Sequence, residues 1–186
     1  MIKKVSKHTG KTIKETASKI VGVSYVDSMR LRNLIKDHLS KYISTDQLGY
    51  DIFAIGEHGP SMVPLIDHIH IGDRVIDSIL SESEIQHVRQ DTILRGNDII
   101  KLTGASSVLG PSHAAVYMID KIVKSNESII PASVWDGTRA IGRVAKFVDC
   151  SFHSIIDVNM SDREKELLYR SQDNIDIYYQ NLFGKD

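Results

Sequence analysis

The sequence predicts one α+β domain over residues 1–186, with strands of mixed or antiparallel direction packed against long helices. Three observations lead to this expectation. Short β-branched runs alternate with longer stretches whose apolar residues follow helical spacing. No internal repeat or Pro/Gly/Ser-rich linker divides the chain. A chain of 186 residues also suits a single core, because proteins of about this size bury roughly two thirds of their unfolded surface.

The first part of the chain predicts the order strand, helix, strand. Residues 19–24 and 51–55 form short β-branched runs that end at glycine or polar residues, as strands do. Between them, residues 26–41 place apolar side chains near helical spacing, with charged residues on the other sides. Residues 63–71 mix alternation with a continuous apolar run, which predicts a further strand.

Two helices are expected next. Residues 81–103 are more charged and helical in character, and Gly104 is suited to end that helix. The following stretch carries apolar residues at positions i, i+3, i+4, i+7 and i+8, a spacing that predicts an amphipathic helix packed on a core. These residues are Ala115, Met118, Ile119, Ile122 and Val123.

The last third predicts short antiparallel strands followed by a long surface helix. Residues 128–135, 141–148 and 154–158 are β-like runs, and Asp136 and Gly137 favour a tight connection between the first two. Ser161 and Glu164 form a capping-box pattern, in which a hydroxyl and a carboxylate satisfy the first free amides of a helix.

Composition argues against several functional classes. Lys and Arg number 23 against 24 Asp and Glu, a net charge of −1, and the basic residues are spread out, so we expect no nucleic-acid partner. No apolar run approaches the ~20 residues of a membrane helix, so we expect no membrane partner. The single cysteine, Cys150, and the lack of an apolar signal core after Met1 favour a reducing, cytoplasmic location.

His58 is the first candidate for chemistry. The segment Gly56-Glu57-His58-Gly59 directly follows an expected strand, which places an imidazole at a strand end where the backbone can turn sharply. Such a histidine can transfer a proton near neutral pH. The same segment also fits a turn that merely contains a histidine.

Asp27 and Arg30 are the second and third candidates, because a spacing of three places both on one face of the expected helix. A carboxylate there can hold His58 in one tautomer and favour its protonated form. A guanidinium can bind a substrate carboxylate through two parallel hydrogen bonds. The alternative is a capping aspartate beside a solvated arginine.

Other polar groups give weaker signals. His68 and His70 alternate on an expected strand, yet the remaining histidines lack ligand spacing, so we expect no metal site. Ser106 and Ser107, between two expected helices, can bind an anion or simply cap a helix. The sequence contains neither Gly-x-Gly-x-x-Gly nor a phosphate-binding Gly-x-x-x-x-Gly-Lys motif, so the residues that would bind a cofactor stay unknown.

Several motifs together resemble the carboxy-terminal domain of the lactate/malate dehydrogenase family. The resemblance covers roughly residues 5–183, and the motifs occur in the order typical of that family. They are residues 26–32 (Val-Asp-Ser-Met-Arg-Leu-Arg), 56–59 (Gly-Glu-His-Gly) with Val63 and Pro64, 104–107 (Gly-Ala-Ser-Ser) and 130–134 (Ile-Pro-Ala-Ser-Val). Pro60 departs from the acidic or small polar residue usual there, and residues 136–157 match only loosely.

The resemblance implies an NAD-dependent oxidoreductase that interconverts a 2-hydroxy acid and a 2-oxo acid. It assigns His58 as the acid/base, Asp27 as its orienting partner, Arg30 as the carboxylate ligand and Ser106 to the substrate pocket. Ser106, with Gly110 and Pro111, slightly favours malate over lactate. NAD is the implied cofactor.

The resemblance also implies that the amino-terminal NAD-binding domain of such enzymes is absent from residues 1–186. A separate NAD-binding domain is then an expected partner, and the isolated chain can be inactive without it. The face that would pack on that domain should be apolar and open to water, so we expect a homo-oligomer. The alternative function is a non-catalytic oligomerisation or interaction module derived from such a domain.

Overall fold

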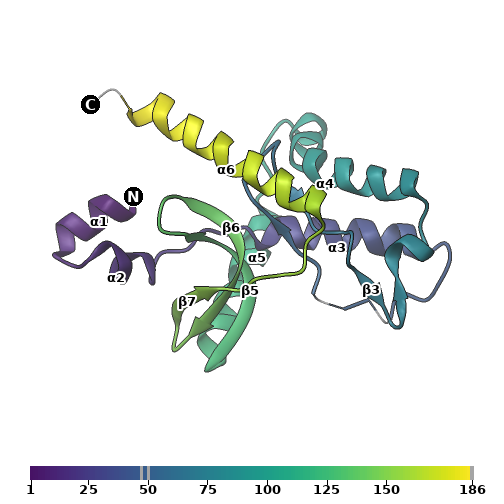
Figure 1. Cartoon of the computed structure of the whole chain (residues 1–186), viewed down its shortest axis with the longest axis horizontal. Coiled ribbons are helices and arrows are strands. Elements are labelled where there is room, and N and C mark those ends of the chain that lie inside the picture. The colour runs from purple at the N-terminus through teal and green to yellow at the C-terminus, as the bar shows by residue number, and fades with distance from the viewer. Residues whose placement is uncertain (47, 50, 185–186) are drawn as a thin grey trace.

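The computed structural model describes residues 1–46, 48–49 and 51–184, and it combines helices with antiparallel strands (Figure 1). The helices are α1 (Ile2–Thr9), α2 (Ile13–Ala17), α3 (Tyr25–Leu39), the 3-10 helix η1 (Ile76–Ser78), α4 (Glu82–Thr103), α5 (Leu109–Lys124) and α6 (Asp162–Phe183). The strands are β1 (Ala54–Ile55), β2 (Val63–Pro64), β3 (His70–Ile71), β4 (Arg74–Val75), β5 (Glu127–Trp135), β6 (Ala140–Val148) and β7 (Ser151–Ile155). The expected α+β class is therefore confirmed.

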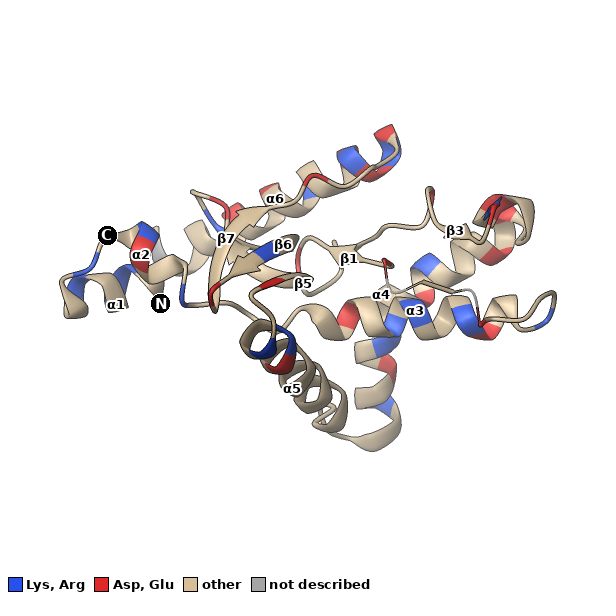
Figure 2. Ribbon diagram, turned by 90° about the horizontal axis from the view of Figure 1, so that it is seen from below, with Lys and Arg blue, Asp and Glu red and all other residues tan. Residues whose placement is uncertain are grey.

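The largest sheet has the order β5-β6-β7, and its strands are antiparallel. Its first connection is tight because the Asp136 carboxylate accepts hydrogen bonds from the amides of Thr138 and Arg139, both at 2.8 Å. Gly137 adopts φ 109° in this turn, a conformation that favours glycine. Helices α5 and α6 lie on opposite sides of this sheet (Figure 2).

The core consists of three clusters of apolar side chains. The first joins α3 and α4 to the segments around β1–β4, and includes Leu31, Ile35, Ile66 and Val88. The second packs α6 against β2 and β6, and the third packs α5 against β5 and β6. Strand β1 connects two of them, since Ala54 belongs to the first cluster and the adjacent Ile55 to the second. This alternation follows from the two-residue repeat of a strand.

Four expected strands differ from the observed ones, and of these, residues 51–55 form a strand only at Ala54–Ile55. Residues 19–24 form no strand and contribute only a bridge between Gly22 and Ser133, so the prediction there was wrong. The run 63–71 is broken into β2 and β3, because a turn at residues 67–68 interrupts it. The last run begins earlier than expected, at Ser151, after Asp149 and Cys150 adopt positive φ angles of 47° and 56°.

Capping groups fix the ends of the longest helices, as expected for Ser161 and Gly104. Capping boxes begin α4 at Ser81 and α6 at Ser161. Gly104 ends α4 with φ 70°, in the left-handed region. Helix α6 is less superficial than its sequence suggests, because Glu164 and Ser171 are buried.

Helix α5 packs on the core through only part of its apolar surface. Met118 is buried in the third cluster with Ile122 against it, but Ile119 and Val123 are exposed, so the expectation that the whole stripe packs inward was wrong. In the ribbon of Figure 2, the Lys, Arg, Asp and Glu residues of α5 lie only towards its carboxy-terminal end. An apolar face of α5 is therefore open to solvent.

Helices α1 and α2 lie at one end of the molecule, and β3 lies at the opposite end (Figure 1). The ammonium of Lys3 in α1 stands 6.0 Å from the centre of the Tyr179 ring in α6. Within the described residues, no helix combines the length and apolar character needed to cross a membrane.

Candidate active site

The amino-terminal turn of α3 places Asp27 and Arg30. Val26 and Leu31 are buried beside them, so this end of α3 packs into the interior of the domain. The ring of Tyr25 stacks on Tyr117 of α5 with centroids 4.5 Å apart, which fixes the start of the helix against its neighbour. Asp27 and Arg30 consequently project together from one face, as their spacing predicts.

His58 lies in the loop that joins β1 to β2. Gly56 leaves the strand with φ 88° and exchanges two backbone hydrogen bonds with Gly142 of β6, each at 2.9 Å. The amide of Glu57 then donates a hydrogen bond to the Ser171 hydroxyl at 2.7 Å. The backbone on the amino-terminal side of His58 is therefore held by two different elements.

The structure brings His58, Asp27 and Arg30 into one hydrogen-bonded cluster. Nδ1 of His58 lies 2.6 Å from Oδ2 of Asp27, and Nη1 of Arg30 donates to Oδ1 of Asp27 at 3.1 Å. The Asp27 side chain is only 4% exposed, whereas that of His58 is 63% exposed. A buried carboxylate thus orients an imidazole that reaches solvent.

The electrostatics of the cluster favour a protonated imidazole. The hydrogen bond from Asp27 raises the pKa of His58 above its ordinary value, and the charges of Asp27 and Glu57 act in the same direction. Partial burial and the charge of Arg30 oppose this effect on the pKa of His58 without reversing it. The raised pKa extends the pH range in which the His58 imidazole stays protonated.

Arg30 adds a cationic group for recognition. Its side chain is 15% exposed, and Nη1 lies 3.5 Å from the position that a Cβ on Gly96 of α4 would occupy. Only Nη1 is engaged in a hydrogen bond with a described residue, so the guanidinium keeps further N–H groups for an anion. An imidazole and a guanidinium thus share one buried aspartate.

A family model for the lactate/malate dehydrogenase alpha/beta C-terminal domain matches residues 25–176. The chain belongs to this family. The resemblance carried by residues 26–32, 56–59, 104–107 and 130–134 is thereby confirmed.

Curated relatives of this dehydrogenase domain include two malate dehydrogenases of Aquifex aeolicus. Malate dehydrogenase 2 is 31% identical over 118 residues, covering 63% of this chain and 34% of that protein. Malate dehydrogenase 1 is 28% identical over 169 residues, covering 85% of this chain and 49% of that protein. The chain therefore spans half or less of the length of these two relatives.

Solved structures of the family have the same fold. Malate dehydrogenase from Plasmodium falciparum matches 96% of this chain and 58% of its own, with 24% identity and a TM-score of 0.80. The lactate dehydrogenase from Cryptosporidium parvum matches 95% of this chain and 60% of its own, with 18% identity and a TM-score of 0.79. The expected likeness to the carboxy-terminal domain of these dehydrogenases is confirmed for the fold.

The other residues singled out in the sequence form no hydrogen bond with this cluster within the described part of the chain. Ser106 is exposed in the loop between α4 and α5 and has no hydrogen bond to the cluster among the described residues. Nδ1 of His70 donates a hydrogen bond to the carbonyl oxygen of His68, 3.0 Å away. In the described ranges, no three His, Cys, Asp or Glu side chains gather as metal ligands.

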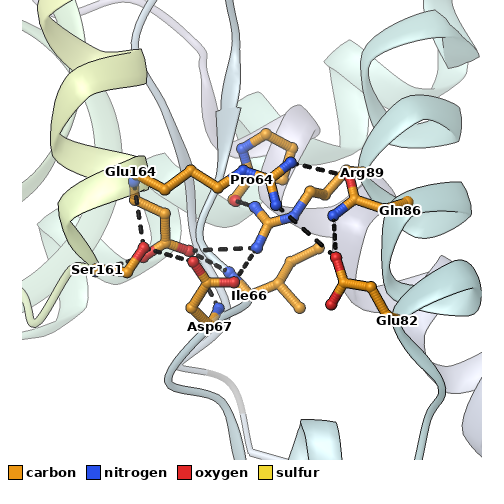
Figure 3. Close-up of polar contacts among 9 residues, drawn as sticks. Pro64, Ile66, Asp67, Glu82, Gln86, Arg89, Ser161 and Glu164 are labelled. Atoms are coloured by element: carbon orange, nitrogen blue, oxygen red, sulfur yellow. Dashed lines mark hydrogen bonds and ion pairs between the residues drawn. The ribbon is translucent and has the colours of Figure 1, made fainter.

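A second polar cluster, around Glu164, connects α6 to α4 (Figure 3). Oε1 of Glu164 accepts hydrogen bonds from the amides of Ile66 and Asp67, at 2.8 and 3.1 Å, and lies 3.8 Å from Nη2 of Arg89. Arg89 also pairs with Asp67 and donates to the Pro64 carbonyl at 2.9 Å. These mutual contacts make the cluster a structural link within the domain.

The sequence alone does not reveal that Ser171 contacts the His58 loop or that the Glu164 cluster links α6 to α4. The capping box identifies Glu164 only as a local group, because its contacts with Ile66 and Asp67 join residues 98 and 97 positions apart. Ser171 lies between polar residues of a helix whose pattern suggests a solvated face. Its burial is a tertiary property that no local signal reveals.

Proposed function

We propose that residues 1–186 are the substrate-binding and catalytic domain of an NAD-dependent 2-hydroxy-acid dehydrogenase, with malate and oxaloacetate as the favoured pair. The observation that carries the proposal is the His58–Asp27–Arg30 cluster within a chain of this family. In this proposal His58 is the acid/base, Asp27 orients it, Arg30 binds the substrate carboxylate, and Ser106 lines the pocket.

The proton transfer follows from the hydrogen bond at Nδ1. Because Asp27 holds Nδ1 at 2.6 Å, Nε2 is the ring nitrogen left to exchange a proton with substrate. In the reducing direction, protonated His58 gives that proton to the carbonyl oxygen of the 2-oxo acid. In the oxidising direction, neutral His58 accepts it from the hydroxyl group, and Asp27 stabilises the imidazolium formed.

Carboxylate recognition is assigned to Arg30. Its planar guanidinium can form two parallel hydrogen bonds with a carboxylate, which fixes the orientation of the substrate as well as its position. Asp27, bonded to both partners, sets the direction of His58 relative to Arg30. A substrate held on Arg30 would therefore present its oxygen near His58.

NAD is the cofactor of the proposal and supplies or accepts the hydride when bound. One solved relative is a Plasmodium falciparum malate dehydrogenase in complex with NADH. The present sequence has no glycine-rich phosphate cradle, so its residues do not fit the dinucleotide's phosphates and none is assigned to them. A separate NAD-binding domain is the partner that the proposal requires.

The test is NADH oxidation, with oxaloacetate and with pyruvate, by this chain combined with a separate NAD-binding domain, beside a His58→Asn control. The proposal expects turnover, faster with oxaloacetate, that disappears in the control. Turnover that persists in His58→Asn would reject the assignment of the acid/base. A well-folded chain that turns over neither acid would favour the alternative below.

Substrate binding can be tested apart from turnover. We expect Arg30→Lys to weaken oxaloacetate binding at least about tenfold, since an ammonium replaces a two-pronged contact with a point charge. Isothermal titration calorimetry measures this effect. Arg95→Lys, the same change at an exposed position of α4, is the matched control and should bind as the parent does.

The alternative function is a non-catalytic oligomerisation or interaction module. It is favoured by exposed apolar side chains at the end of α4 and along α5, namely Leu102, Val108, Leu109, Val116, Ile119 and Val123. Leu102 and Leu109 are 86% and 85% exposed, and contiguous apolar surface of this kind marks protein interfaces. Light scattering over a wide concentration range tests it: a homo-oligomer is expected, and a monomer throughout would contradict it.

A further inference from the structure

The loop that carries His58 is held on one side by α6. Ser171 of α6 is fully buried, and its hydroxyl accepts a hydrogen bond from the Glu57 amide at 2.7 Å. Glu57 precedes His58 directly, so the peptide group that leads into the histidine is fixed to this hydroxyl. From these contacts we infer that Ser171 is a positioning residue that sets the place of the His58 imidazole relative to Asp27.

Close packing at the base of the loop supports this role. A Cβ on Gly56 would meet the Ser171 hydroxyl oxygen at 2.6 Å, closer than any normal contact, so the loop approaches α6 at a glycine. The Ser61 hydroxyl lies 3.3 Å from the same oxygen and donates to the Glu57 carboxylate. Both ends of the loop therefore converge on Ser171.

Packing around the loop is incomplete near its carboxy-terminal end. A cavity of about 440 Å³ lies between α4 and α6, and Pro60, Ser61 and Met62 contribute to its wall. Open space there means that close packing does not by itself prevent the loop from shifting. The hydrogen bond to Ser171 supplies a constraint where packing is incomplete.

Two other contacts also hold the segment around His58, one on each side of Glu57. The paired backbone hydrogen bonds between Gly56 and Gly142 hold the loop to β6 two residues before His58. Asp27 holds the imidazole itself at 2.6 Å. Without the bond at Glu57, the residue between these anchors can rotate, and the contact between His58 and Asp27 then loosens. The inference rests on the proposed acid/base role of His58, but the geometry it describes can be measured without turnover.

The test compares Ser171→Ala with Ser171→Thr by NMR. In Ser171→Ala, we expect the Glu57 amide to exchange with solvent about tenfold faster, as for one lost hydrogen bond of ordinary strength. We expect the pKa of His58 to fall towards its ordinary value of about 6.5, because the Asp27 contact that raises it weakens. Ser171→Thr retains the hydroxyl and should preserve both properties. The His58→Asn spectrum assigns the resonance among the eight histidines.

Ser81→Ala is the control for general loss of stability. It removes a helix cap from α4, where the hydroxyl bonds only within its own capping box. It should lower the melting temperature as Ser171→Ala does, yet leave the pKa of His58 unchanged. Should Ser171→Ala not fold, Ser171→Cys, which keeps the shape but accepts hydrogen bonds weakly, takes its place.

Two outcomes would overturn the inference. If Glu57 exchange rises in Ser171→Ala while the pKa of His58 stays at the parent value, Ser171 only satisfies a buried amide. If Ser81→Ala lowers the pKa of His58 equally, the effect is one of global stability. Neither result changes the outcome of the NADH oxidation assay, which tests the acid/base role of His58 through the His58→Asn variant. The Ser171 inference and the proposed function can therefore fail independently.

Discussion

The carboxylate of Glu164 provides the sharpest test of how this domain is held together. Its Oε1 accepts from the amides of Ile66 and Asp67 and faces Arg89, while Oε2 accepts from the Ser161 amide at 3.0 Å. The side chain is fully buried, so water cannot replace any of these partners. Glu164→Gln keeps the size of the side chain and converts one acceptor oxygen into a donor NH2 group.

Either orientation of the new amide leaves a backbone donor without an acceptor. If the oxygen stays on Ile66 and Asp67, the NH2 group faces the Ser161 amide; the reverse orientation deprives two amides. A buried donor left unpaired costs about 1–3 kcal/mol, and Arg89 also loses one of its two carboxylate neighbours. We expect Glu164→Gln to lower the free energy of unfolding by about 2–4 kcal/mol.

Urea unfolding followed by far-UV circular dichroism measures this loss. The matched control is Glu84→Gln, the same change at the same position of the α4 capping box, where the carboxylate accepts from the Ser81 amide at 2.9 Å. Glu84 is accessible to water, which can replace the lost contacts, so its loss should be much smaller. Equal losses in the two variants would refute the reasoning, since the tertiary contacts of Glu164 would then add nothing to helix capping.

Two further predictions concern the loop of the candidate site. The hydrogen bond from His58 to Asp27 raises the pKa of His58 in the folded state. The bond therefore contributes fully to the free energy of unfolding below about pH 6.5, and this contribution is lost as the pH rises through the raised pKa. His58→Asn should remove that part of the pH dependence of unfolding measured between pH 5 and 9. Gly56→Ala should lower the melting temperature far more than Gly104→Ala; both glycines have positive φ, but only at Gly56 would the new Cβ collide with Ser171. Similar melting temperatures in the two glycine variants would contradict this.

Local sequence signals predict the four longest helices of the described residues and the long strands well, but they did not predict α1 or α2. Capping boxes at Ser81 and Ser161 and the glycine at position 104 mark helix ends through contacts within one turn, so periodicity and capping suffice there. The run at residues 19–24 misleads because β-branched residues favour a strand only where a partner edge exists. Here the segment meets β5 at a single position, Gly22 with Ser133, and pairs no further.

In the candidate site too, local sequence signals predict some contacts and not others. The proximity of Asp27 and Arg30 follows from helical spacing alone, and it is observed. The approach of His58 to Asp27 joins residues 31 positions apart, so residue chemistry only suggests it and family resemblance supports it. Burial of Ser171 and Glu164 depends on contacts about 100 residues away, which no single-sequence pattern reports.

The geometry of the His58 cluster is a property of the whole domain rather than of one motif. Asp27 belongs to α3, which packs in the first apolar cluster, whereas the anchors of the His58 loop, β6 and α6, pack in the second. Strand β1 is shared, since Ala54 faces one cluster and Ile55 the other. The distance of 2.6 Å between His58 and Asp27 therefore depends on how the two clusters pack against each other. A change that shifts α6 against α3 should act on the imidazole even when it leaves every residue of the cluster in place.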